Sequence, residues 1–145
     1  MAVPAHLHRT GHATRRHLVL AYRRELVAIF LGGCAGALLR ALLIEAFPVD
    51  PGQWPWATVI ANLVGAFALG VISTLLPPSA YGRPLLGTGF CGALTTFSTL
   101  QLELLRMLER GEEGLALVYA SVSIVAGLLA VIAGTALVRG RSEEP

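Results

Sequence analysis

Long stretches of the chain carry no charged residue and are long enough to cross a membrane. No charge occurs in residues 51–82, 84–102 or 114–138, and the stretch 26–47 carries only Arg40 and Glu45. A run of about twenty apolar residues is typical of a transmembrane helix. Clusters of Pro and Gly separate the runs and indicate turns. The pattern therefore predicts four membrane-spanning helices, over residues 26–47, 56–76, 84–107 and 115–138.

The composition supports a membrane protein. Hydrophobic residues make up 54% of the 145 residues and charged residues 14%, whereas soluble domains carry roughly 25% charged residues. A chain of this size cannot bury so much apolar surface in its own interior, so the excess must face lipid or a partner. The net charge of +2 is too small to indicate nucleic acid as a ligand. A disordered chain, a nucleic-acid module and most soluble enzymes are excluded.

Residues 1–24 differ from the rest of the chain. They hold five of the eleven basic residues, all of which are Arg, and all four His. We predict an exposed, mobile tail over 1–24, a four-helix domain over 25–139 and a short C-terminal tail over 140–145. A metal site built from His6, His8, His12 and His17 is an alternative, but metal ligands need a rigid frame. Cys34 and Cys91 lie in apolar segments, so we expect both to be unpaired.

Small residues recur at helical spacing. Gly32 and Gly36 are four residues apart in the first predicted span. The second and fourth spans show the same spacing in Ala61 and Gly65, Ala66 and Gly70, and Ala130 and Gly134. Such residues allow helix backbones to approach closely in lipid. Each span is therefore expected to have a close neighbour. Because four short helices offer few inward faces, we also expect an oligomer.

Polar residues inside the first two spans need an explanation. Arg40 could extend its side chain to the lipid headgroups or point into a water-filled vestibule. Asn62 lies far from any charge, and Thr58 precedes it by one turn on the same helix face. The amide N–H groups of Asn62 could bind an anion. Alternatively, they could form a hydrogen bond between helices.

The third span has glycines and hydroxyls at its centre. Gly weakens a helix, and Ser and Thr side chains compete for backbone hydrogen bonds, so residues 87–99 predict a break in the helix. A break frees carbonyl oxygens for a cation and N–H groups for an anion, although a simple kink is the alternative. Glu103 follows one turn later, as part of a polar track or as a partner for Arg106. Tyr119 and Ser123 share a face of the fourth span.

Taken together, three motifs resemble those of the fluoride channel family, known as Fluc or CrcB. They are GGCAGALLR at 32–40, WATVIANLVGAF at 56–67 and GFCGALTTFST at 89–99. The third motif is highly specific, whereas the first alone would be weak. The resemblance covers about 26–138 and leaves the tail outside. It implies an all-α membrane protein that conducts fluoride passively out of the cytoplasm across the plasma membrane, and not an enzyme.

The resemblance also implies an assembly and a set of site residues. It implies an antiparallel dual-topology dimer with two fluoride pores and a structural, untransported sodium ion at its centre. The sodium ligands would be the backbone carbonyls of Gly92 and Thr95. The residues implied on or beside the fluoride path are Asn62, Phe97, Thr58, Ser123, Tyr119, Glu103 and Arg40. The chain departs from the family pattern at Leu100, where a second pore phenylalanine is expected.

Other functions fit less well. A small proton-coupled multidrug antiporter also has four helices, but it needs a carboxylate within its first helix, and residues 26–39 contain none. A purely structural membrane subunit would not need Asn62 or the hydroxyls of 95–99. A membrane enzyme is disfavoured because no His lies in the spans.

The distribution of arginines bears on the dimer partner. The side that holds both termini and the 76–84 connection carries eight arginines, and the other side carries two. Basic residues near the spans set the orientation. This imbalance favours a fixed orientation and an oppositely oriented paralogue as partner. Without residues 1–24 the count is three against two, and a homodimer is then the better interpretation.

Overall fold

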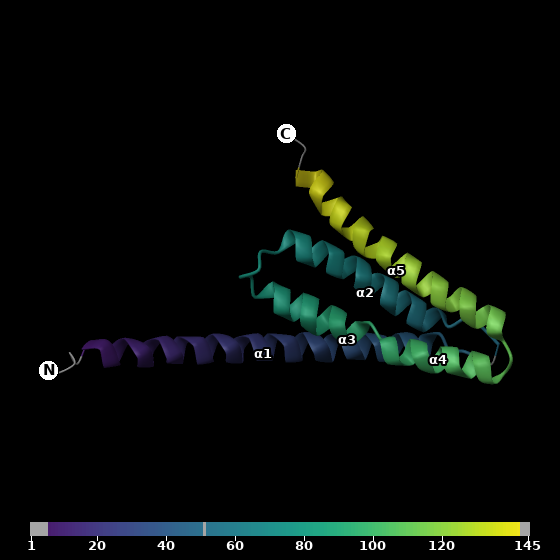
Figure 1. The fold of residues 1–145 in the computed structure, drawn as a ribbon, viewed down its shortest axis with the longest axis horizontal. Helices are drawn as coiled ribbons and strands as arrows, with labels where there is room; N and C mark the ends of the chain where they lie inside the picture. The colour runs from purple at the N-terminus through teal and green to yellow at the C-terminus, as the bar shows by residue number, and fades with distance from the viewer. Residues whose placement is uncertain (1–5, 51, 143–145) are drawn as a thin grey trace.

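The computed structural model describes residues 6–50 and 52–142, and within them every regular element is helical. The first two helices are α1 (His6–Ala46) and α2 (Trp56–Leu75). A π-helix, η1 (Arg83–Cys91), then runs directly into a single α-helical turn, α3 (Gly92–Leu94). The last two helices are α4 (Phe97–Glu109) and α5 (Glu113–Ser142). Figure 1 shows both termini and the α2–η1 connection toward one end of the molecule, with the other two connections at the opposite end.

Three helical stretches are long and apolar enough to cross a membrane. They are Tyr22–Ala46, Trp56–Leu75 and Glu113–Arg141, and they correspond to the first, second and fourth predicted spans. The predicted span over 84–107 is divided among η1, α3 and α4. Thr95 and Thr96 between α3 and α4 are extended, with ψ angles of 150° and 119°. The glycines and hydroxyls of this segment account for the interruption, since they weaken helical pairing.

The segment predicted as an N-terminal tail is helical from His6, because α1 begins there and continues to Ala46 without a break. Extending an existing helix adds one hydrogen bond per residue without a new nucleus, and the Ala, Leu and Arg of this segment favour helix. At the other end, α5 continues to Ser142, into the predicted C-terminal tail. Residues 1–5, 51 and 143–145 lie outside the described residues. The side chains of the four histidines also lie outside them.

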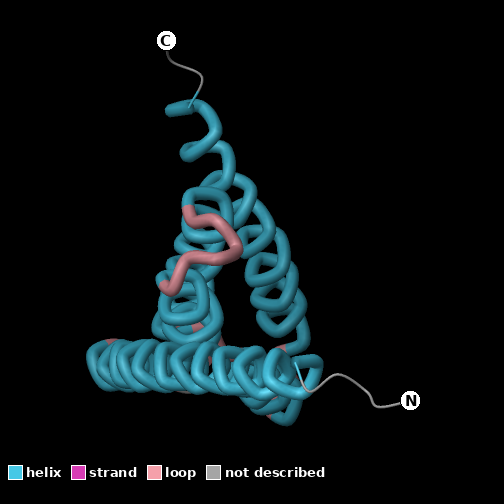
Figure 2. Tube along the Cα trace, turned by 90° about the vertical axis from the view of Figure 1, so that its left-hand side faces the viewer, coloured by secondary structure: helices cyan, strands magenta, loops and turns pink. Residues whose placement is uncertain are grey.

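Glycines hold the helices in direct backbone contact. A Cβ atom at Gly32 or Gly36 of α1 would clash with the carbonyl oxygens of Leu85 or Phe90 in η1. Between α2 and α5 the same holds for Gly70 and Gly134, against the carbonyls of Val131 and Phe67. The expected close approach of the helices is therefore confirmed at these crossings. Figure 2 shows the result, with α1 along the base and the other helices rising from it.

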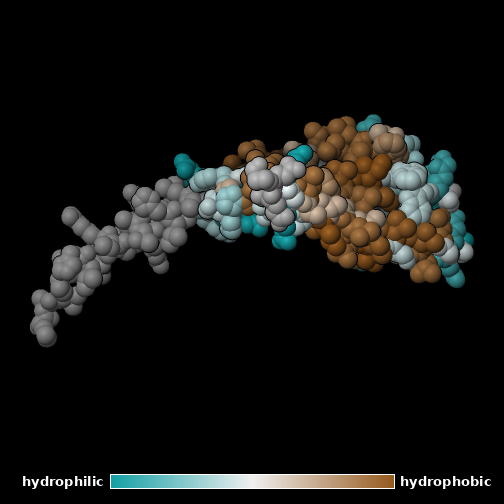
Figure 3. Space-filling view, turned by 90° about the horizontal axis from the view of Figure 1, so that it is seen from above, coloured by the Kyte–Doolittle hydropathy of each residue, from teal (hydrophilic) through white to brown (hydrophobic). Residues whose placement is uncertain are grey.

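A small core lies where α2, α4 and α5 meet. Its buried members are Val59, Leu100, Met107, Ala116 and Tyr119. Most large apolar side chains lie outside this core, on the surfaces of α1 and α5, and Figure 3 shows hydrophobic residues over the middle of the molecule. Cys34 and Cys91 form no disulfide, as predicted. The exposed apolar surface agrees with the expectation that this chain faces lipid or a partner.

Candidate functional site

The side chain of Asn62 on α2 pairs with the backbone of Thr96 at the interruption. Asn62 Oδ1 accepts a hydrogen bond from the Thr96 N–H at 2.7 Å, and Asn62 Nδ2 donates to the Thr96 carbonyl oxygen at 3.2 Å. An extended residue inside an apolar region leaves its backbone groups without helical partners, which is costly. The Asn62 side chain supplies a partner for both the N–H and the carbonyl of Thr96. One of its two amide N–H donors remains available.

Thr96 caps the helix that follows the interruption. It is the N-cap residue of α4, and its Oγ1 accepts a hydrogen bond from the Thr99 N–H at 3.1 Å. The same hydroxyl donates to Thr99 Oγ1 at 2.9 Å. Thr is one of the residues preferred at this position, because its side chain satisfies an N–H group left free by the helix end. Only 6% of Thr96 is exposed, so these bonds are made away from solvent.

These two interactions divert the hydrogen bonds of a continuous helix. In such a helix the Thr96 N–H would donate to the Gly92 carbonyl, and the Thr99 N–H would donate to the Thr95 carbonyl. Here the Thr96 N–H donates to Asn62 and the Thr99 N–H donates to the Thr96 hydroxyl. The carbonyl oxygens of Gly92 and Thr95 thus lose their usual helical donors. They are the two carbonyls that the family resemblance implies as sodium ligands.

Asn62, Phe97 and Ser123 line a common cavity of about 250 Å³, together with Thr95, Thr96, Leu100 and Ile124. The ring of Phe97 is 72% exposed, so it is free to meet a ligand. Ser123 Oγ is buried and has no hydrogen-bond partner in the described part of the chain. Leu100 reaches the cavity but is largely buried in the core. Three of the predicted fluoride-path residues therefore lie together.

Three further predicted residues form a hydrogen-bonded group beside this cavity. Glu103 Oε1 accepts from Thr58 Oγ1 at 2.7 Å, and Glu103 Oε2 accepts from Tyr119 OH at 2.5 Å. Thr58 and Tyr119 are both buried. The carboxylate thus links α2, α4 and α5. The described residues contain no ion pair between Glu103 and Arg106, although both line a separate cavity of about 190 Å³.

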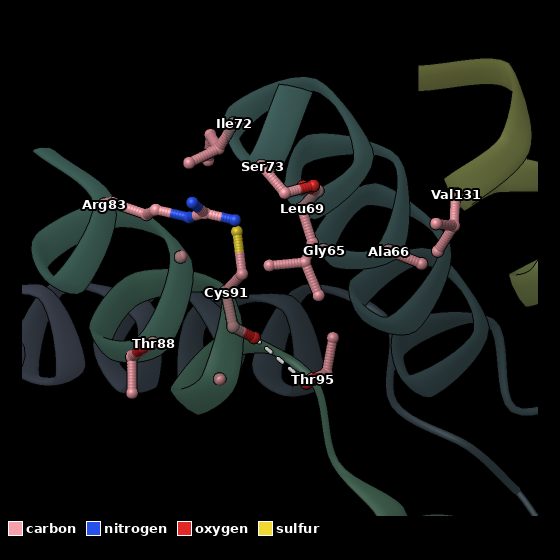
Figure 4. A pocket seen from close by; sticks show the side chains of 12 residues that line it. Gly65, Ala66, Leu69, Ile72, Ser73, Arg83, Thr88, Cys91, Thr95 and Val131 are labelled. Carbon is pink, nitrogen blue, oxygen red and sulfur yellow. Dashed lines mark hydrogen bonds between the residues drawn. The ribbon is translucent and has the colours of Figure 1, made fainter. Parts of the chain in front are cut away.

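The remaining predicted residues are Gly92, Thr95 and Arg40, and of these only Thr95 also lines the first cavity. Gly92 and Thr95 line a second cavity, of about 510 Å³, into which Arg83 and Cys91 also point (Figure 4). Thr95 Oγ1 donates to the Cys91 carbonyl at 2.9 Å, which is the dashed line in Figure 4. Arg40 is half-buried on α1 and forms no hydrogen bond or ion pair in the described part of the chain. The geometry therefore does not place Arg40 with the other predicted fluoride-path residues.

Sequence reasoning did not single out Thr96. The signal was present, because Thr is one of the residues preferred at the N-cap of a helix. Its pairing with Asn62, which is 34 residues away in the chain, depends on how α2 packs against the interruption. Sequence spacing alone does not reveal that packing.

Several apolar helices of spanning length, with a polar group between them, define a multi-pass membrane protein. Residues 27–135 match the CrcB-like protein, Camphor Resistance (CrcB), family. The chain belongs to this family, and its place is the plasma membrane.

Curated relatives agree with the family assignment. The chain is 55% identical over 120 residues to the fluoride-specific ion channel FluC 1 of Mycobacterium bovis, covering 80% of this chain and 91% of the relative. It is 43% identical over 122 residues to FluC 1 of Staphylococcus aureus strain NCTC 8325, covering 81% and 99%. FluC 2 of Nocardia farcinica is 42% identical over 118 residues, covering 79% and 84%.

Proposed function

We propose that this chain forms a fluoride-selective channel that lets fluoride leave the cytoplasm passively and so lowers its cytoplasmic concentration. Relatives that cover most of the chain are named fluoride-specific ion channels. No proton coupling or catalysis is part of the proposal.

The observation that carries the proposal is the cavity shared by Asn62, Phe97 and Ser123. Fluoride is small and strongly hydrated, so a selective path must replace its water with donors. The Ser123 hydroxyl has no partner in the described residues, and Asn62 keeps one free N–H donor. The edge of the Phe97 ring is the positive part of its quadrupole and can meet an anion. Glu103 organises the adjoining hydroxyls of Thr58 and Tyr119 along the same path.

The functional assembly in this proposal is an antiparallel dimer with four spans in each subunit. The segment 83–109, interrupted at Thr95 and Thr96, serves as the third span, broken at mid-membrane. Such a break is tolerated where it faces protein or a water-filled cavity, and Asn62 and a partner subunit would provide that protein surface. The exposed apolar side chains of α1 and α5 are available to cover this break in the dimer. The partner is a second copy or an oppositely oriented paralogue.

A structural sodium ion at the dimer centre completes the proposal. Sodium is a hard cation that prefers oxygen ligands, and the Gly92 and Thr95 carbonyls have lost their helical donors. These carbonyls would hold the ion together with those of the partner. When bound, the ion supplies a fixed positive charge: at ~10 Å and an effective dielectric near 20 it attracts an anion by roughly 1.7 kcal/mol. Arg40 belongs to an outer vestibule in this arrangement.

The test is fluoride efflux from liposomes that contain the purified full-length chain, followed with a fluoride electrode. We expect rapid efflux that is selective for fluoride over chloride and independent of a proton gradient. A small four-helix multidrug antiporter would instead move an organic cation in exchange for protons. Efflux that depends on a proton gradient, or that does not distinguish fluoride from chloride, would contradict the proposal.

A further inference from the structure

Two arginines and a tyrosine from distant parts of the sequence line a cavity at the end of the molecule that carries the termini. Arg23, Arg24 and Val27 belong to α1, and Tyr81 belongs to the α2–η1 connection. These are the described residues that line the cavity, whose volume is about 520 Å³. Figure 1 shows this connection on the same side of the molecule as the N-terminal part of α1. The cavity is separate from the one that holds Asn62 and Ser123.

The positive charge of this cavity is not neutralised within the described part of the chain. Arg23 and Arg24 are exposed and form no ion pair or hydrogen bond there. Glu25 follows them directly, but about 100° per residue places it on the side of α1 opposite Val27. Arg83 is the first residue of η1, two residues after Tyr81, and adds positive charge to this part of the chain. The cavity therefore attracts an anion.

The residues around the cavity are of the types expected where a helix enters a lipid bilayer. The predicted first span begins at residue 26, directly after Arg23, Arg24 and Glu25, so both arginines stand at its outer edge. Val27 and Leu31 follow Arg23 at intervals of four residues and therefore continue the same helix face into the span. Each of these two apolar side chains is 57% exposed. Tyr81, also 57% exposed, has the amphipathic ring that is typical of the lipid headgroup region.

We propose that Arg23, Arg24 and Tyr81 bind the phosphate of an anionic phospholipid, whose acyl chain lies along Val27 and Leu31. Arginine forms strong, charge-assisted hydrogen bonds to phosphate oxygens, and the Tyr81 hydroxyl supplies a further donor. A free phosphate ion shares the headgroup chemistry, but it would make no use of the apolar face below the arginines. The proposal does not depend on fluoride conduction.

The experiment measures lipid binding to the purified full-length protein in detergent by native mass spectrometry. Phosphatidylglycerol is titrated against phosphatidylcholine with the same acyl chains, and inorganic phosphate is titrated separately. The variant is R23Q/R24Q. The matched control, R139Q/R141Q, removes the same charge from the last turn of α5. Y81F tests the hydroxyl alone.

The native chain is expected to retain phosphatidylglycerol in preference to phosphatidylcholine. R23Q/R24Q is expected to bind phosphatidylglycerol about 25-fold more weakly, since each arginine near an anionic lipid contributes about fivefold. Y81F is expected to bind it a few-fold more weakly, and R139Q/R141Q as the native chain does. An equal loss of phosphatidylglycerol binding in R23Q/R24Q and R139Q/R141Q would overturn the proposed site, because binding would then depend on net charge alone. Binding of inorganic phosphate as tight as that of phosphatidylglycerol would overturn the assignment to a lipid.

Discussion

Asn62 and Thr96 are joined by two hydrogen bonds that use both polar atoms of the Asn62 side chain. Asn62 Oδ1 accepts from the Thr96 N–H at 2.7 Å, and Asn62 Nδ2 donates to the Thr96 carbonyl at 3.2 Å. One bond removes the donor that a helix would offer to the Gly92 carbonyl. The remaining Nδ2 hydrogen is available to the cavity. A single amide thus connects the proposed fluoride path with the proposed sodium site.

Asn62→Asp is expected to reduce fluoride efflux from liposomes about 100-fold or more. The carboxylate has no N–H to donate to the Thr96 carbonyl or to fluoride. It also adds a negative charge, and two like charges at ~4 Å repel by roughly 4 kcal/mol at an effective dielectric near 20. Gln101→Glu is the control, because it adds the same charge at an exposed position of α4. Efflux by Asn62→Asp at the native rate would rule out a direct role for this amide.

Ser123→Ala is expected to slow efflux about tenfold while leaving thermal stability unchanged. The Ser123 hydroxyl has no partner in the described residues, so its removal breaks no hydrogen bond in the protein. A hydrogen bond to a charged group contributes about 1.5–3 kcal/mol, and that contribution would be lost to a passing fluoride ion. Ser121→Ala, at an exposed position of the same helix, is the control. A drop in melting temperature with unchanged efflux would indicate that Ser123 serves packing instead.

Thr96→Val is expected to destabilise the purified protein by about 1–2 kcal/mol in thermal unfolding in detergent. It keeps the shape of the side chain but removes the hydroxyl that accepts from the Thr99 N–H. The loss of a Thr cap costs about 0.5–2 kcal/mol, and this cap is buried. Thr96→Ser retains the hydroxyl and should lose less than half as much. Equal destabilisation by both variants would show that packing of the methyl group, not capping, is the main contribution.

Gly92→Val is expected to abolish stabilisation of the purified protein by sodium relative to N-methylglucamine. A Cβ atom at Gly92 meets nothing within 4 Å in the chain, so the protomer itself can accept the side chain. Thr95→Val should keep sodium stabilisation, because the proposed ligand is its backbone carbonyl. Gly140→Val is the control, since a Cβ atom there also meets nothing within 4 Å. If native protein is equally stable in both cations, the sodium proposal fails.

The elements that were predictable from the sequence are those with a continuous apolar pattern. The predicted second span, 56–76, differs from Trp56–Leu75 by one residue, and the fourth lies inside Glu113–Ser142. Residues 6–24 were less predictable. Their Arg and His content is typical of a solvated tail, whereas in the structure they form the first part of α1. The glycines and hydroxyls around Thr95 predicted an interruption of the helix. They did not predict that η1 would be a π-helix.

The site was predictable as a set of residue types but not as a set of contacts. Asn62, Ser123 and Glu103 stood out because polar groups are rare within apolar spans. The partners of these residues could not be inferred, since Asn62 bonds to Thr96 and Glu103 to Thr58 and Tyr119 across separate helices. Spacing along one helix indicated Arg106 as a partner for Glu103, whereas the fold provides two hydroxyls from neighbouring helices.

The pairing of Asn62 with Thr96 also orders events during biogenesis. A ribosome makes α2 before the segment that contains Thr95 and Thr96, so the amide enters the bilayer ahead of the backbone that it must satisfy. The interrupted segment would carry exposed N–H and C=O groups if it were inserted alone, which hydrocarbon does not tolerate. In the proposed four-span arrangement, its insertion therefore requires that α2 is already in place. A gene rearranged to encode the segment 83–109 ahead of α2 would deprive the translocon of that helix.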